Sequence, residues 1–189
     1  MHSSRFLASL IALGVAVASS AGAAPSASPS GIARTPRALA VTSRLPAPPE
    51  GVAELKFAEM FKTPIGPKGL EPTERLRLLD GRRVRMVGYV VQQQPPIPGA
   101  FLLSPLPVFA GDEDESLADD IPPSAVLVRL PHARQARVPA LPGLVQVSGT
   151  LHVGESEAGS RVATAHLELD AASERALVTS MPRKQKASR

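Results

Sequence analysis

The stretch LLDGRRVRMVGYVV, residues 78–91, decides the fold class of this chain. Asp80-Gly81 is a strong turn dipeptide, because glycine tolerates positive φ and aspartate hydrogen-bonds to its own backbone. The residues after the turn are mostly β-branched or bulky, which predicts a strand. Gly88 interrupts this strand and indicates a bend or a bulge. A second stretch, GLVQVSGTL at residues 143–151, has the same character, with Gly149 in mid-strand.

Five strands are expected in all, over residues 82–92, 100–104, 125–130, 144–153 and 161–169. In the last two, apolar and polar residues alternate, so one face of each strand should be buried and the other wet. Residues 54–61 and 72–79 have the character of short helices. The pattern predicts a mainly β protein: a small five-stranded OB-like antiparallel barrel with one or two short N-terminal helices. Gly88 and Gly149 are expected to mark bends, or points of close backbone approach, that let the barrel close.

The N-terminal 23 residues have the form of a secretory signal peptide. Arg5 precedes the uncharged apolar run 6–17, and residues 21–23 read AGA, a small-residue cleavage site. An uncleaved membrane anchor is the alternative, but a span needs about 20 apolar residues. We therefore expect an exported mature protein, periplasmic or secreted.

The rest of the chain divides into three parts by composition. Residues 24–51 are rich in alanine, proline and serine, and are predicted to be a disordered linker. Residues 52–171 contain all five expected strands and form the predicted OB-like domain. Residues 172–189 are predicted to be a basic disordered tail. A chain from Val52 to Ala171 is accordingly expected to fold as well as the whole mature protein.

The sequence pI of about 10.0 comes from the ends of the chain rather than from the domain. Between Glu54 and Asp170 there are 12 basic and 15 acidic residues. Aromatic residues make up only 3% of the chain, whereas barrels that bind nucleic acid usually offer stacking aromatics in a basic groove. No nucleic-acid partner is expected. The basic tail either contacts an anionic membrane surface or has no binding role.

Several stretches together resemble an uncharacterised family of small secreted bacterial proteins. They are residues 79–91, Phe101-Leu102-Leu103, Pro122-Pro123 and residues 147–151, and the resemblance extends from Leu55 to Leu169. It implies an OB-like barrel in a protein that is often accessory to ABC-type transport or export systems. Family members often carry cysteine and histidine between the second and third strands. Here Phe109-Ala110-Gly111 and an acidic run stand in that loop, so a metal or redox role of the loop has no such ligands in this chain.

Two groups of side chains are candidates for metal binding. His152 and His166 fall on the wet faces of adjoining strands and could hold Zn²⁺ or Cu²⁺ if the hairpin register pairs them, with Glu168 as the nearest third ligand. Asp112 and Asp114 supply oxygen atoms of the kind that Ca²⁺ takes, but the loop lacks the EF-hand glycine and terminal glutamate. The simpler interpretations are two unlinked exposed histidines and a solvated, self-repelling loop.

No catalytic motif is recognisable. The chain has no cysteine and no G-x-S-x-G or H-E-x-x-H pattern. Ser148 lies near His152 in sequence, but nothing supplies a nucleophile, a base and an oxyanion hole together. We expect no enzyme and no cofactor. The sequence favours a non-enzymatic periplasmic binding or adaptor protein, and its expected partner is another envelope protein. The alternative is a metal-binding or metal-handling periplasmic protein.

Overall fold

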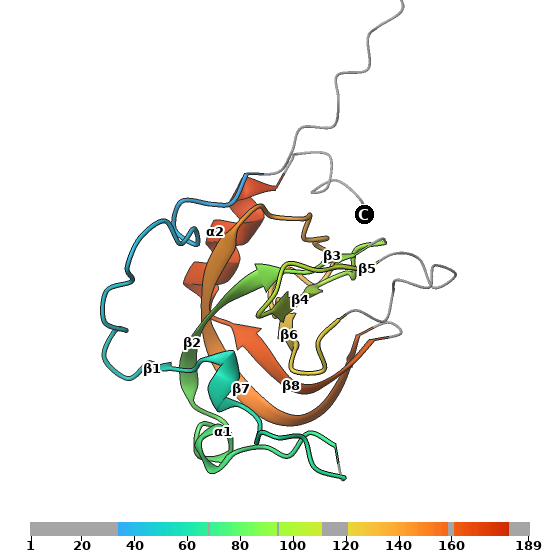
Figure 1. The fold of residues 1–189 in the computed structure, drawn as a ribbon. Coiled ribbons are helices and arrows are strands. Elements are labelled where there is room, and N and C mark those ends of the chain that lie inside the picture. Colours follow the sequence, from blue (N-terminus) through green and yellow to red (C-terminus); the bar gives the residue numbers. More distant parts are fainter. Residues whose placement is uncertain (1–33, 68, 94, 111–120, 159–160, 182–189) are drawn as a thin grey trace, which may run out of the picture. The chain divides into compact units, whose positions relative to one another are not determined.

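A computed structural model describes residues 34–67, 69–93, 95–110, 121–158 and 161–181 of the chain (Figure 1). The predicted signal peptide, residues 24–33 and the acidic pair Asp112 and Asp114 lie outside these residues. The elements in chain order are β1 (Ala53–Glu54), the 3-10 helix η1 (Phe57–Glu59), α1 (Glu74–Leu78), β2 (Arg83–Val90), β3 (Gln92–Gln93), β4 (Ala100–Ser104), β5 (Phe109–Ala110), β6 (Val126–Arg129), β7 (Leu144–Ala158), β8 (Arg161–Leu169) and α2 (Ala171–Ser180).

The main sheet has six strands in the order β1-β2-β4-β6-β8-β7, and β2 also pairs with β7. The pairings of β2, β4, β6, β8 and β7 therefore lead back to β2, and Figure 1 shows these strands curving round one another. β7 is long enough to pair with β2 through residues 144–150 and with β8 through residues 149–158. β3 and β5 form a separate two-stranded sheet.

The mainly β class is confirmed, but the prediction of five antiparallel strands is wrong in two respects. A sixth strand, β1, joins the sheet, and both β1–β2 and β6–β8 pair in parallel. β8 follows β7 as the second arm of a hairpin and pairs with β6 on its other side. Alternation of apolar residues shows that a strand has a buried face, but it contains no information on the direction of the neighbouring strand.

The two expected N-terminal helices are shorter than predicted. Residues 54–61 contain the end of β1 and a single turn of 3-10 helix, while residues 74–78 form α1. Thr73 caps α1, because its side chain accepts a hydrogen bond from the backbone N–H of Leu76 at 3.1 Å. Leu76 is fully buried, and it anchors α1 to the core.

The predicted buried faces of the last two strands are confirmed. Val145, Val147 and Leu151 of β7 join the main core, as do Ala165 and Leu167 of β8, while the polar residues between them are half-buried. We call the side of the strands that points away from this main core the outer face. A second, smaller apolar cluster lies on the outer face of β4 and β6, and it contains Ala100, Leu102 and Leu127 with Ile97, Val108 and Ile121 packed against them.

Both mid-strand glycines are points of close approach, as predicted. A Cβ built on Gly88 would lie 2.7 Å from the carbonyl oxygen of Ser104 on β4. A Cβ on Gly149 would overlap the carbonyl oxygen of Glu168 on β8. The strands meet at these places more closely than any side chain would allow.

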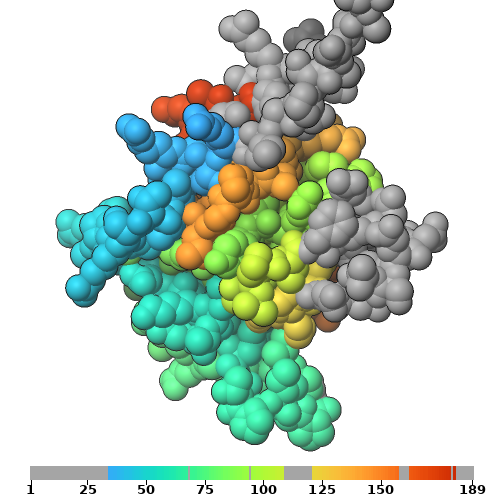
Figure 2. Space-filling view, turned by 45° about the horizontal axis from the view of Figure 1, so that its top comes forward, coloured from blue at the N-terminus to red at the C-terminus, as the bar shows by residue number. Residues whose placement is uncertain are grey.

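Residues 34–51 are not the disordered linker that their composition predicts. Leu39 is buried in the main core, and Ala40 pairs with Val145 of β7. The backbone N–H of Gln146 donates to the carbonyl oxygen of Leu39 at 2.7 Å, and that of Val41 donates to Leu144 at 3.1 Å. Figure 2 shows this blue segment against the orange start of β7. One leucine and a few backbone hydrogen bonds order the segment, and composition does not reveal them.

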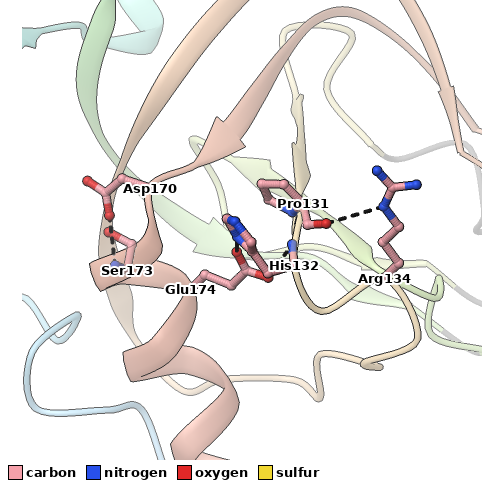
Figure 3. Close-up of polar contacts among 6 residues, drawn as sticks. All are labelled: Pro131, His132, Arg134, Asp170, Ser173 and Glu174. Atoms are coloured by element: carbon pink, nitrogen blue, oxygen red, sulfur yellow. Dashed lines mark hydrogen bonds and ion pairs between the residues drawn. The ribbon is translucent and has the colours of Figure 1, made fainter.

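The predicted disordered tail begins instead with a helix, α2, which packs against β7 (Figure 1). Asp170 caps it by accepting a hydrogen bond from the N–H of Ser173 at 2.7 Å. Glu174, only 4% exposed, accepts a hydrogen bond from the backbone N–H of His132 and contacts the Nδ1 atom of the same residue, both at 2.9 Å (Figure 3). Leu177 is buried in the main core. Among the described residues, no helix has the length and apolar character needed to cross a membrane.

Candidate functional site

The register of β7 and β8 places His152 directly opposite His166. Their rings stack with centroids 4.7 Å apart and planes inclined by 17°. Both rings lie on the outer face, because each histidine alternates with residues of the main core. The predicted pairing of the two histidines is therefore confirmed.

Glu168 is the third member of this group. It lies two residues after His166 on β8, so the two side chains share a face. One ligand atom from each of His152, His166 and Glu168 can be chosen so that all three lie within 4.8 Å of one another. The Nε2 atom of His152 is 3.9 Å from the Oε2 atom of Glu168. Three ligands around a tetrahedral Zn²⁺ lie about 3.3 Å apart, given metal–ligand bonds of about 2.0 Å, so the side chains need to close by roughly 1 Å.

A turn on the neighbouring chain segment holds β7 in place beside His152. Asp80 accepts a hydrogen bond from the backbone N–H of Val153 at 3.0 Å. The N–H of Gly81 donates to the carbonyl oxygen of Leu151 at 2.8 Å, and Gly81 has φ of +70°, which favours glycine. The turn that opens the first predicted strand thus supports the residues on both sides of His152.

The electrostatic environment favours the neutral, metal-binding form of His166. Burial lowers the pKa of His166 from its ordinary value of 6.5, and the charges of His152 and Arg129 lower it further. The carboxylates of Glu168 and Asp80 act in the opposite direction. A ring that is neutral near pH 7 offers a nitrogen lone pair to a metal without first releasing a proton.

Sequence reasoning did not identify Asp80 or Arg129 as neighbours of the histidines. The sequence pattern assigns Asp80 to a turn and Arg129 to the expected strand of residues 125–130, and it indicates no contact of either with the histidines. Arg129 pairs in register with Glu168 on β8, a parallel contact that local sequence does not specify. A signal for Asp80 did exist, because the Asp-Gly turn begins the strand that β7 pairs with.

The other candidates are not brought together with the histidines by the described residues. Asp112 and Asp114 lie outside the part of the chain that the structure describes. The N–H of Ser148 donates to the hydroxyl of Ser173 at 3.3 Å, which places Ser148 beside α2. The remaining described histidine, His132, contacts Glu174 and holds α2 to the loop after β6 (Figure 3).

The outer face of β4 and β6 differs from the histidine surface. Every residue of β4 is buried, and the second apolar cluster occupies its outer side. The chain itself therefore covers this face, whereas the side chain of His152 is 40% exposed and that of Glu168 50% exposed. The histidine group is accessible to a ligand from solvent.

The chain matches no protein-family model and no curated protein. Among solved structures, it is similar to a DUF3299 family protein from Pseudomonas aeruginosa PAO1. The TM-score is 0.41 and the sequence identity 16%, over 62% of this chain and 91% of that one. A likeness of this size identifies neither a family nor an activity.

Proposed function

We propose that this protein is a non-enzymatic metal-binding protein, with His152, His166 and Glu168 as the ligands of a divalent transition metal. The observation that carries the proposal is the direct pairing of His152 with His166 on adjoining strands, with Glu168 within reach of both. Two imidazoles and one carboxylate suit Zn²⁺ or Cu²⁺, whereas Ca²⁺ and Mg²⁺ take oxygen ligands.

The scaffold in this proposal is an OB-type barrel. Five strands that pair in a ring, with β6 and β8 parallel, support this type. OB-type barrels that bind oligonucleotides or oligosaccharides use the face of their second and third strands. Here those strands are β4 and β6, and their outer face is filled by the second apolar cluster. This favours the exposed surface of β7 and β8 as the binding surface.

Titration calorimetry of the folded protein with Zn²⁺ and with Cu²⁺ tests the proposal. We expect one bound ion per chain, and we expect H152A and H166A each to weaken binding by at least about tenfold, because each removes one of the three ligands that the described residues bring together. H132A is the matched control, since His132 lies on the loop beside α2 and contacts Glu174. If neither metal bound, or if H152A and H166A bound like the H132A control, the proposal would be wrong.

The predicted signal peptide would place this protein in the periplasm. A metal-binding protein there is compatible with the accessory role beside a transport system that the sequence resemblance implies, with an envelope protein as its partner. Cross-linking in intact cells that recovers no protein of a transport system would contradict this part of the proposal.

A further inference from the structure

Two buried polar atoms without partners flank the histidine group. Among the described residues, the buried side-chain atoms that lack a hydrogen-bond partner are Nε of Arg85, Nε of Arg129 and Oγ1 of Thr164. Thr164 shares the outer face of β8 with His166, two residues further along. Arg129 lies beside Glu168 in the register of β6 and β8. A buried polar atom without a partner is unfavourable, so these two atoms, on residues next to the histidine group, point to a ligand that would accept hydrogen bonds from both.

Other groups fix the position of the Arg129 side chain. Its Nη2 atom donates to the hydroxyl of Ser156 and to the carbonyl oxygen of Glu157, each at 2.8 Å. Both acceptors lie on β7 beyond the bulge that follows Val153. The Arg129 side chain thus extends from β6 across β8 to its acceptors on β7. Its Nε–H has no hydrogen-bond acceptor among the described residues.

The charges around the site do not balance for a metal ion alone. Glu168 and Asp80 each contribute one negative charge near His166, and Arg129 contributes one positive charge. A divalent ion at this site would therefore keep one uncompensated positive charge close to the guanidinium. Three protein ligands also leave one position of a tetrahedral ion open.

We infer that the metal-loaded site binds a small carboxylate anion as its fourth ligand, with Arg129 and Thr164 as hydrogen-bond donors to that anion. This inference rests on the proposed metal site. A monoanion supplies the missing negative charge, and one of its oxygen atoms binds the metal while the other accepts hydrogen bonds. Hydrogen bonds from a guanidinium to a carboxylate are among the strong ones in proteins.

The experiment uses Cu²⁺ as a spectroscopic probe in the folded protein. Acetate is added to the Cu²⁺-loaded protein, and the visible and electron paramagnetic resonance spectra report a change in copper ligation; phosphate is added in a parallel arm. We expect a saturable change with acetate. R129Q and T164V should each raise the half-saturating acetate concentration, R129Q by about tenfold, because each removes one donor to the anion.

R134Q is the matched control, because Arg134 is an exposed arginine whose Nε donates to the carbonyl oxygen of Pro131 in the loop after β6. R129Q should bind Cu²⁺ at least as tightly as the unchanged protein, since it removes a positive charge beside the ion. If R129Q fails to fold, T164V still tests the anion site, because T164V leaves the Arg129 contacts intact.

The outcomes separate the two proposals. If Cu²⁺ binds but acetate leaves the spectra unchanged, or if R129Q and T164V titrate like R134Q, the anion inference is overturned and the metal site stands. A change with phosphate alone would overturn the carboxylate assignment. Failure of the unchanged protein to bind Cu²⁺ and Zn²⁺ would instead overturn the proposed function.

Discussion

Gly149 is the residue at which the close contact of β7 and β8 can be tested. Its missing side chain lets the carbonyl oxygen of Glu168 approach, and that oxygen belongs to the backbone of a paired strand. Overpacking normally costs about 1–3 kcal/mol, and a backbone group can yield less than a side chain. We expect G149A to lower the free energy of unfolding by at least about 2 kcal/mol, and G149V by more, in urea denaturation.

The matched control for that substitution is G66A. A Cβ at Gly66 meets nothing within 4 Å, so this change should leave the free energy of unfolding almost unaltered. A G149A protein as stable as G66A would show that β7 and β8 do not approach each other so closely.

The pKa of His166 predicts how the metal-free protein responds to acid. Because burial lowers this pKa in the folded state, folding favours the neutral ring. The resulting stability is fully present above the ordinary value of 6.5 and is lost as the pH falls through the folded-state pKa. As the pH falls, the free energy of unfolding should therefore decrease more for the unchanged protein than for H166Q. Nuclear magnetic resonance should find His166 titrating below 6.5; a higher value would contradict the assigned environment.

At the scale of elements, α2 is held by contacts that are far apart in sequence. Leu177 fills part of the main core, and Glu174 reaches the backbone of His132 across 42 residues. Replacing a buried leucine by alanine typically costs 2–5 kcal/mol. We expect L177A to lower the free energy of unfolding by about that amount, and E174A to lower it by about 1–3 kcal/mol through the orphaned N–H of His132.

R175A is the control on the same helix, because Arg175 is exposed. Its effect on the urea midpoint should be small. Equal midpoints for R175A, L177A and E174A would mean that α2 does not contribute to the stability of the sheet.

The strands were predictable from the sequence because their signals are local. Val145, Val147 and Leu151 alternate with polar residues, and this alternation also placed His152 and His166 on one face. The helix α2 was not predicted because its stability depends on the contacts of Glu174 with His132 and of Leu177 with the main core. Local composition does not show these contacts. Its cap was visible in the sequence, since Asp170 and Ser173 have the spacing of an N-cap pair. The parallel pairing of β6 with β8, which brings Arg129 to Glu168, depends on the topology of the whole sheet.

For the whole molecule, the boundaries of the folding unit are wider than the predicted domain of residues 52–171. The segment of residues 34–51 and the helix α2 both contact the sheet at β7. A chain that begins at Val52 loses the buried side chain of Leu39. It also loses the hydrogen bond from the N–H of Gln146 to the carbonyl oxygen of Leu39, and the one from the N–H of Val41 to the carbonyl oxygen of Leu144. A chain of residues 52–171 lacks both sets of contacts, so we expect it to be less stable than the mature protein, contrary to the prediction from composition.

We expect a chain starting at residue 52 to unfold at lower urea concentration than a chain starting at residue 34, with both continuing to residue 189. Burial of one leucine contributes about 1.5–3 kcal/mol, and each net hydrogen bond contributes about 0.5–1.5 kcal/mol. The deletion should thus lower the free energy of unfolding by about 2 kcal/mol or more. L39A in the longer chain should reproduce a large part of the loss, whereas R37A should not, because Arg37 is exposed. Equal midpoints for the two chains would show that residues 34–51 rest on β7 without stabilising it, and the predicted boundary at Val52 would then be restored.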